Sequence, residues 1–213
     1  MNRRLGILIS GRGSNLQAIL DAIRAGSLDA EIAVVVSNRP GALGLERARA
    51  AGIEALTVDY RTFPDREAFE RVVVDELRRR GVGLVCLAGF MRRLSPLFVA
   101  AFPGAIVNIH PSLLPAFPGL EAQRQALECG VTIAGATVHI VDEQLDHGPI
   151  VAQATVPVHP DDTPDTLADR ILEVEHRIYP EAIGLVLDGW TAPATRLDRS
   201  SSGGESAERF SDR

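Results

Sequence analysis

An apolar run and a glycine-rich turn stand near the start of the chain, in the stretch Leu5-Gly6-Ile7-Leu8-Ile9-Ser10-Gly11-Arg12-Gly13-Ser14-Asn15-Leu16. The run Leu5–Ile9 is short, rich in Leu and Ile, and bounded by turn residues, which is typical of a buried strand. After the turn, apolar residues recur at helical spacing, at Leu16, Ile19, Leu20 and Ile23. We therefore expect a strand, a turn, and a helix that is capped by Ser14 or Asn15 and stopped by Gly26.

The same alternation of apolar runs and helical patterns continues along the chain. Further strands are expected at Glu31–Ser37, Ala55–Val58, Gly83–Leu87 and Ala105–Ile109. Two later patterns, Ala136–Val141 and Ile150–Val158, are close enough in sequence to pair antiparallel. The sequence thus predicts an α/β fold whose central sheet is mostly parallel, with an antiparallel portion at one side and helices on both faces.

Two helices have clear start signals. One begins near Asp65, and its buried face is expected to hold Phe69, Val72, Val73 and Leu77. The last helix begins at Thr163-Pro164, a capping residue followed by Pro at the first helical position, and Pro180 is expected to kink or restart it. Between these helices, prolines interrupt the pattern after Leu87, so long functional loops are expected there.

Length and composition favour a single folded domain. The chain has 213 residues, of which 46% are hydrophobic, and we expect one domain over residues 1–190 followed by a disordered tail over 191–213. We find no apolar stretch long enough to cross a bilayer and no signal peptide. A cytoplasmic protein with no membrane partner is therefore expected.

Charge excludes several functions. The formal net charge is −6, which argues against a nucleic-acid partner. All 22 basic residues are arginine, because the chain contains no lysine. Schiff-base chemistry, pyridoxal phosphate anchoring and a Walker-type phosphate lysine are therefore excluded.

Neither a disulfide nor a metal site is expected. The chain has two cysteines, Cys86 and Cys129, and Cys86 lies in an apolar run that is typical of a buried, reduced thiol. Three histidines, His139, His159 and His176, are interpreted as isolated, so no set of metal ligands is recognised.

The first candidate site is the turn Ser10–Asn15 between the first strand and the first helix. Glycines allow the backbone to approach a ligand, and free N–H groups with the helix dipole favour an anion such as phosphate. A nicotinamide cofactor is disfavoured, because the third glycine of the dinucleotide fingerprint is missing and Ser37-Asn38-Arg39 follows the second strand in place of an acidic residue. A structural turn without a ligand is the alternative.

The second candidate site is Asn108-Ile109-His110, which follows the apolar run Ala105–Val107. If this run is a strand, the side chains of Asn108 and His110 share a face at its carboxyl end, where ligands bind in open α/β sheets. An amide donor beside a histidine is suited to stabilising the oxyanion formed by attack on an acyl or formyl carbon. His110 alone would favour a structural interpretation, but the pair favours a catalytic one.

The third candidate site is the acidic loop between the last two strand patterns. Asp142 and Glu143 are expected to be solvated loop charges. Asp146 stands before His147-Gly148-Pro149, and this turn would aim its carboxylate at His110. Such a carboxylate would keep the imidazole protonated and relay a proton.

Four motifs, occurring in this order, resemble the folate-dependent formyltransferase family of purine synthesis. They are Ile9–Ala18, Leu87–Arg92, Asn108–Pro115 and Leu145–Pro149. The resemblance covers about Leu5 to Trp190 and implies a Rossmann-like formyltransferase fold, 10-formyltetrahydrofolate as co-substrate and no metal. It also implies glycinamide ribonucleotide as the amine acceptor, small-molecule partners only, and a monomer or homodimer.

The resemblance also implies roles for individual residues. Asn108, His110 and Asp146 match the catalytic trio of the family, which would hold the oxyanion and move the proton during direct attack by the acceptor amine. Residues that match the contacts to the ribonucleotide and its phosphate are Gly13, Ser14, Asn15 and Glu175. Residues that match the folate contacts are Arg66, Met91, Arg92, Arg93, Leu94 and Asn108. Departures from the family occur at Ala116, Ala134 and His147, and none of them removes a member of the trio.

Three alternative functions remain open on the sequence alone. A formyltetrahydrofolate deformylase resembles this fold and trio but gives the formyl group to water, usually with an extra N-terminal domain and without need of a phosphate cradle. A methionyl-tRNA formyltransferase would require a further C-terminal domain and a basic surface. A non-catalytic folate or nucleotide sensor would not need the complete trio.

Overall fold

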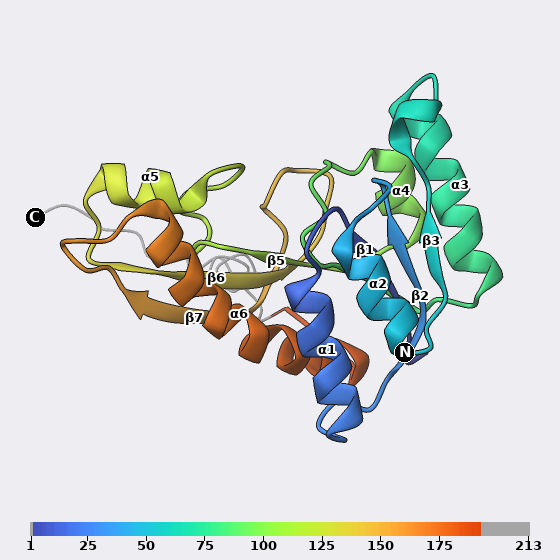
Figure 1. Cartoon of the computed structure of the whole chain (residues 1–213), viewed down its shortest axis with the longest axis horizontal. Helices are drawn as coiled ribbons and strands as arrows, with labels where there is room; N and C mark the ends of the chain where they lie inside the picture. The colour runs from blue at the N-terminus through green and yellow to red at the C-terminus, as the bar shows by residue number, and fades with distance from the viewer. Residues whose placement is uncertain (1, 193–213) are drawn as a thin grey trace, which may run out of the picture.

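The computed structural model describes residues 2–192, in which a seven-stranded sheet runs through the middle of the molecule (Figure 1). The strands are β1 (Arg4–Ile9), β2 (Glu31–Ser37), β3 (Ala55–Thr57), β4 (Leu84–Leu87), β5 (Ile106–His110), β6 (Ile133–Ile140) and β7 (Ile150–Pro157). Their order across the sheet is β3-β2-β1-β4-β5-β6-β7. The first five strands pair in parallel, whereas β6 pairs antiparallel with both β5 and β7. This confirms the predicted mixed sheet.

Helices cover both faces of the sheet. They are α1 (Ser14–Arg24), α2 (Leu43–Ala50), the 3-10 helix η1 (Tyr60–Thr62), α3 (Arg66–Arg79), α4 (Pro96–Ala101), α5 (Ala122–Cys129) and α6 (Pro164–Leu187). In β1, Ile9 lies against Gly44 of α2, whereas Gly6 lies beneath Leu77 of α3. Because residues three apart in a strand point to opposite faces, α2 and α3 lie on opposite sides of the sheet. The long helix α6 packs against α1 and along β6 and β7.

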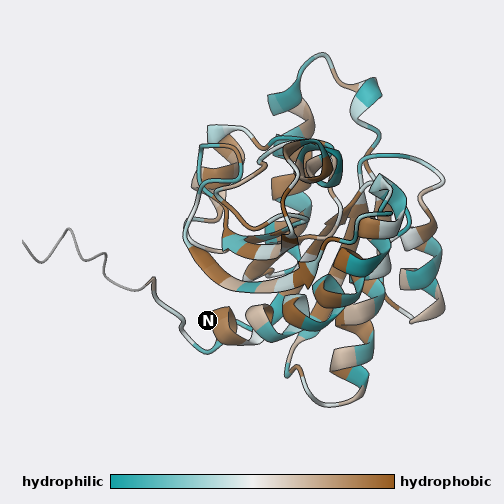
Figure 2. Cartoon of the chain, turned by 90° about the vertical axis from the view of Figure 1, so that its left-hand side faces the viewer, coloured by the Kyte–Doolittle hydropathy of each residue, from teal (hydrophilic) through white to brown (hydrophobic). Residues whose placement is uncertain are grey.

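The core consists mainly of the strands and the helix faces that cover them. In β1 and β4 every residue from Leu5 to Ile9 and from Leu84 to Leu87 is buried, as expected for parallel strands covered on both faces. Figure 2 shows this arrangement, with mostly apolar strands in the middle and more hydrophilic residues on the outer turns of the helices. Within the described part of the chain, no helix combines the length and the hydropathy needed to span a membrane.

The start of α1 differs from the prediction. Neither Ser14 nor Asn15 caps the helix, because α1 already begins at Ser14 and its N-cap is Gly13. Gly13 has a φ of 71°, a left-handed conformation that glycine adopts without strain, and it turns the chain directly into the helix. In the structure no side chain caps this helix, so the N–H groups of its first turn are left free of side-chain partners.

Other helical predictions need smaller corrections. On α3, Val72 is 38% exposed, and Val74 takes its expected place in the core. Pro180 does not restart α6, which is continuous over Pro164–Leu187 and is held to the sheet by the neighbouring Tyr179. The expected loops after Leu87 contain two short helices, α4 and α5. The expected tail falls almost entirely on residues 193–213, which lie outside the described residues.

Candidate active site

The central strand β5 carries Asn108 and His110 on one face at its carboxyl end. Antiparallel pairing places Asn108 opposite His139 of β6 and His110 opposite Thr137. The Thr137 hydroxyl donates to the Ser112 carbonyl oxygen at 2.7 Å, which fixes the chain directly after β5. Pairing with β6 therefore positions Asn108 and His110, and the hydrogen bond from Thr137 fixes the loop that follows them.

His110 lies between two oxygen acceptors. Its Nδ1 is 3.5 Å from Oδ2 of Asp146, and its Nε2 is 2.9 Å from the Phe117 carbonyl oxygen. The side chains of His110 and Asp146 are 7% and 9% exposed, so this contact is largely shielded from water. Both ring nitrogens of His110 therefore face oxygen acceptors, which fixes the orientation of the imidazole.

Both residues that contact His110 have unusual backbone conformations. Phe117 has a φ of 54° and Asp146 a φ of 50°, in the left-handed region that costs a non-glycine residue roughly 1–2 kcal/mol. Asp146 is fixed further by the Gly119 N–H, which donates to its Oδ2 at 2.8 Å. Strained residues of this kind persist where their surroundings hold them and are common at functional sites.

The structure adds His139, a residue that the sequence analysis wrongly interpreted as isolated. The amide Nδ2 of Asn108 donates to its Nε2 at 3.2 Å, and its Nδ1 lies 3.1 Å from the Ile140 carbonyl oxygen. Burial lowers the pKa of His139, which agrees with a neutral ring that accepts at Nε2. The residue was missed because only the β5–β6 register brings it beside Asn108.

The predicted anion cradle lies at the carboxyl end of β1. Gly13 packs so closely on α2 that a Cβ atom there would come within 2.6 Å of the Gly44 Cα. The Gly44 N–H donates to the Gly11 carbonyl oxygen at 3.1 Å, and Arg47 Nε donates to the Arg12 carbonyl oxygen at 3.0 Å. The turn is therefore fixed by α2 while the first N–H groups of α1 remain available for an anion.

Glu175 of α6 joins the cradle from the other end of the chain. The Asn15 amide donates to Glu175 Oε2 at 2.7 Å, and only 7% of each residue is exposed. Burial raises the pKa of the Glu175 carboxyl, and the hydrogen bond from Asn15 opposes this shift. Asn15 Oδ1 is buried and has no hydrogen-bond partner among the described residues, which leaves one acceptor unused beside the cradle.

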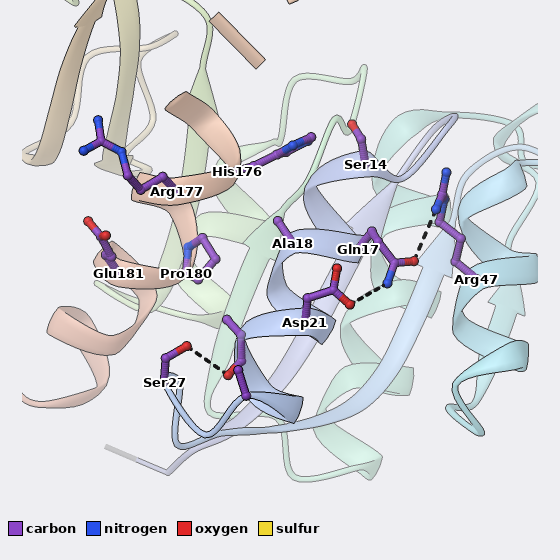
Figure 3. A pocket seen from close by; sticks show the side chains of 12 residues that line it. Ser14, Gln17, Ala18, Asp21, Ser27, Arg47, His176, Arg177, Pro180 and Glu181 are labelled. Atoms are coloured by element: carbon purple, nitrogen blue, oxygen red, sulfur yellow. Dashed lines mark hydrogen bonds between the residues drawn. The ribbon is translucent and has the colours of Figure 1, made fainter. Parts of the chain in front are cut away.

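A groove between α1 and α6 opens beside the cradle (Figure 3). Its volume is about 670 Å³. Ser14 and Gln17 of α1 line one side, and His176 of α6 points across toward Ser14. Arg47 reaches the rim, where it bonds to Gln17 at 3.2 Å. The groove therefore begins beside the anion cradle at Ser14 and follows α1 toward Ala25.

The residues that match folate contacts lie on two segments. Met91 is 58% exposed and Leu94 is buried, so the side chain of Met91 faces solvent and that of Leu94 does not. The Arg92 guanidinium lies 4.1 Å from the centre of the Tyr60 ring, and Arg92 Nε has no partner in the described part of the chain. Arg66 is exposed at the first position of α3.

Three neighbouring strands bring these groups to one edge of the sheet. The cradle follows β1, the segment with Met91 and Arg92 follows β4, and Asn108 and His110 end β5. β2 and β4 lie on opposite sides of β1, so the strand order reverses at β1. Open α/β sheets bind ligands at such switch points.

The acidic loop contains one further pair. Asp142, expected to be a solvated charge, contacts Nδ1 of His147 at 2.9 Å near the surface. Over residues 2–192, no three His, Cys, Asp or Glu side chains are grouped as metal ligands would be.

Together, the open α/β sheet, the amide–imidazole–carboxylate cluster and the uncapped start of α1 are typical of group-transfer enzymes, which in open α/β sheets bind ligands at the carboxyl ends of parallel strands. The family model described as formyl transferase matches residues 3–183. The chain belongs to the formyl transferase family.

Individual relatives agree with this family. The chain is 48% identical over 183 residues to a phosphoribosylglycinamide formyltransferase of Escherichia coli, covering 86% of each chain. It is 49% identical over 189 residues, 88% of its length, to a trifunctional purine biosynthetic protein of Drosophila melanogaster, but it spans only 14% of that protein. A crystal structure of glycinamide ribonucleotide transformylase 1 from Symbiobacterium toebii matches with 57% identity and a TM-score of 0.87, covering 88% of this chain and 89% of that one. The predicted Rossmann-like formyltransferase fold is thereby confirmed.

Proposed function

We propose that this chain transfers the formyl group of 10-formyltetrahydrofolate to the amine of 5'-phosphoribosylglycinamide in the de novo synthesis of purines (IMP). The products are the N-formyl ribonucleotide and tetrahydrofolate. The observation that carries the proposal is the buried contact of His110 with Asp146, beside Asn108, in a chain whose family transfers formyl groups. A cytoplasmic location, and a monomer or homodimer with small-molecule partners only, complete the proposal.

Asn108 and His110 stabilise the negative charge that develops on the formyl oxygen. The Asn108 amide uses one hydrogen on His139, and its second hydrogen remains for the oxyanion. His110 Nε2 donates to the Phe117 carbonyl oxygen, so it reaches the oxyanion by exchanging one oxygen acceptor for another. His110 keeps the same number of hydrogen bonds in this exchange, and the stronger, charge-assisted bond to the oxyanion offsets the loss of the bond to the Phe117 carbonyl oxygen.

Asp146 supports the positive charge on His110 and assists the proton transfer. As the acceptor amine attacks the formyl carbon, it gains a positive charge and must lose a proton, while the folate nitrogen that leaves must gain one. A shielded carboxylate 3.5 Å from the His110 ring is placed to stabilise that ring and to help move the proton.

The cradle and Glu175 are assigned to the ribonucleotide. The uncapped N–H groups of α1 at Gly13, Ser14 and Asn15 suit the phosphate, since they are unsatisfied donors at the positive end of a helix dipole. Glu175, held by Asn15 at 2.7 Å, would contact the same substrate.

The folate is assigned to Asn108, Arg66 and the residues Met91 to Leu94. Arg66 is exposed, so its guanidinium has donors available for the carboxylates of a folate. Arg92 is half-buried, and its Nε has no hydrogen-bond partner among residues 2–192. Met91 offers exposed apolar surface on the same segment, whereas Leu94 contributes backbone, because its side chain is in the core.

The test compares two products. The purified chain is incubated with 10-formyltetrahydrofolate in the presence and absence of 5'-phosphoribosylglycinamide, and formylated ribonucleotide and free formate are both measured. We expect formyl product that depends on the amine, with little formate. Formate released at the same rate without the amine would show a deformylase and overturn the proposal.

A further inference from the structure

The segment between β4 and α4, residues 88–95, includes Met91 to Leu94 and is fixed at both ends. At its start, the Ser10 N–H donates to the Gly89 carbonyl oxygen at 3.1 Å, and the Met91 N–H donates to the Ser10 hydroxyl at 2.8 Å. The Ser10 hydroxyl donates to Oδ1 of Asn38 at 2.6 Å, so this attachment is itself anchored to the residue that follows β2.

At its other end, the segment is held by Glu70 of α3. The Ser95 N–H lies 3.0 and 3.3 Å from the two carboxylate oxygens of Glu70, and the Ser95 hydroxyl also donates to this carboxylate. Ser95 is the N-cap residue of α4, but its own side chain makes no capping bond. Glu70 therefore holds the point where the segment enters α4.

Glu70 is an unusual residue for a helix that packs on a core. It is 1% exposed and Ser95 is fully buried. The ion pairs of α3 in the described structure use Glu67 and Glu76 rather than Glu70. A buried carboxylate without a cation is costly unless hydrogen bonds compensate it, and here they come from Ser95.

Between its two attachments, the segment presents side chains that the attachments do not use. The Arg92 guanidinium rests on the Tyr60 ring, and Arg93 Nη2 donates to the Glu143 carbonyl oxygen at 3.3 Å. Met91 remains 58% exposed. The surface assigned to the folate is thus ordered before any ligand arrives, and loss of either attachment would increase the conformational entropy that binding must remove.

We propose that Glu70 is a positioning residue for the folate-binding segment, acting through Ser95 and without touching the substrate. The inference rests on the proposed function, because it uses the assignment of residues 91–94 to the folate. A purely structural role would lower stability alone, whereas a positioning role also weakens folate binding and leaves the ribonucleotide site unchanged.

The test uses Glu70→Gln, which keeps the size of the side chain but replaces one acceptor oxygen by a donor. Val73→Ala is the matched control, because Val73 is 1% exposed on the same helix and its truncation leaves the carboxylate in place. For each variant we would measure the melting temperature, KM for both substrates, kcat, the Kd of tetrahydrofolate, and amide hydrogen exchange over residues 88–95.

For Glu70→Gln we expect faster exchange over residues 88–95 and about a tenfold rise in the folate KM and in the Kd of tetrahydrofolate, with the ribonucleotide KM and kcat within about twofold. Ser95→Ala should raise the folate KM less than Glu70→Gln, and the double variant should be no worse than Glu70→Gln. Val73→Ala should lower the melting temperature without these changes.

Either of two results would overturn the inference: a folate KM and Kd unchanged in Glu70→Gln, or equal rises for both substrates. Failure of the proposed function is distinguishable. If the unaltered chain did not formylate the ribonucleotide, exchange over residues 88–95 and tetrahydrofolate binding would still decide the role of Glu70, and an unaltered chain that bound no tetrahydrofolate would overturn both.

Discussion

Asn108 has two amide hydrogens, and within residues 2–192 one of them has a hydrogen-bond partner. His139 accepts that hydrogen, and the low pKa that burial imposes on His139 keeps its Nε2 available as an acceptor. The orientation of the amide is thus fixed by the residue directly opposite it on the neighbouring strand β6. Asn108 and His110 were predictable because a spacing of two places them on one face of a strand, whereas His139 required the register of β5 with β6.

Replacing Asn108 with Ala tests the oxyanion assignment. We expect kcat to fall by about 10²–10³, because one donor to the developing charge is lost, while the melting temperature stays close to that of the parent. Steady-state kinetics on the folded variant measures this. A folded Asn108→Ala chain with nearly normal turnover would contradict the assignment.

Glu175 gives a pH-dependent prediction. Burial raises the pKa of its carboxyl above 4.5 in the folded chain, so the native state binds this proton more tightly than the unfolded state. The resulting stabilisation is complete below about pH 4.5 and is lost as the pH rises through the folded pKa. Glu175→Gln removes this dependence, so the free energy of unfolding of the variant relative to the parent should increase between pH 5 and pH 8.

Urea unfolding at several pH values would measure this difference. Glu173→Gln serves as the control, because Glu173 is an exposed carboxylate on the same helix. A difference between Glu175→Gln and the parent that stays constant over the whole pH range would show that Glu175 is not the group responsible.

At the scale of elements, the strands were far easier to predict than the connections. All seven strands carry compact runs of Val, Ile and Leu or a period of two, and the structure places each within a few residues of its expected range. The region after Leu87 was harder, because prolines suggested loops where α4 actually begins at Pro96. The turn that contains Asp146 predicted that its carboxylate faces His110, but its left-handed φ depends on tertiary contacts that no local pattern reports.

The turn between β6 and β7 should tolerate no side chain at Gly148. A Cβ atom there would lie 1.9 Å from the Ile140 carbonyl oxygen, and this backbone group cannot move without shifting β6. We expect Gly148→Ala to lose about 1–3 kcal/mol of stability and much of its activity, because Asp146 lies on the same turn.

Gly184→Ala is the matched control for that variant. On α6 its Cβ would meet only Leu28, at an ordinary contact distance of 3.7 Å. Because alanine is favoured over glycine inside a helix, this control should be neutral or slightly stabilising in thermal unfolding. Equal stability of the two alanine variants would show that the turn has more room than the structure indicates.

At the scale of the whole molecule, the site unites segments from most of the chain. The cradle spans Ser10–Asn15 and its partner Glu175 lies in the middle of α6, with the catalytic cluster between them in the sequence. The buried core likewise extends from Leu5 to Leu187. The folded body described by the structure therefore contains every residue assigned to catalysis or binding.

A chain that ends at Trp190 tests whether this body is sufficient. The Trp190 N–H donates to the Leu185 carbonyl oxygen at 3.0 Å, so such a chain keeps the last turn of α6. We expect its melting temperature and kcat to match those of the full chain. A marked fall in either would assign a role to residues 191–213.

The hydrogen bond from Asn15 to Glu175 joins positions 160 residues apart. During synthesis on the ribosome, the first strand and helix emerge long before α6, so the nascent chain carries the cradle without its partner until α6 has been made. The nucleotide end of the site is thus completed only when α6 docks. In a refolding experiment, recovered formyl transfer would consequently report the return of the entire molecule and not of its N-terminal half alone.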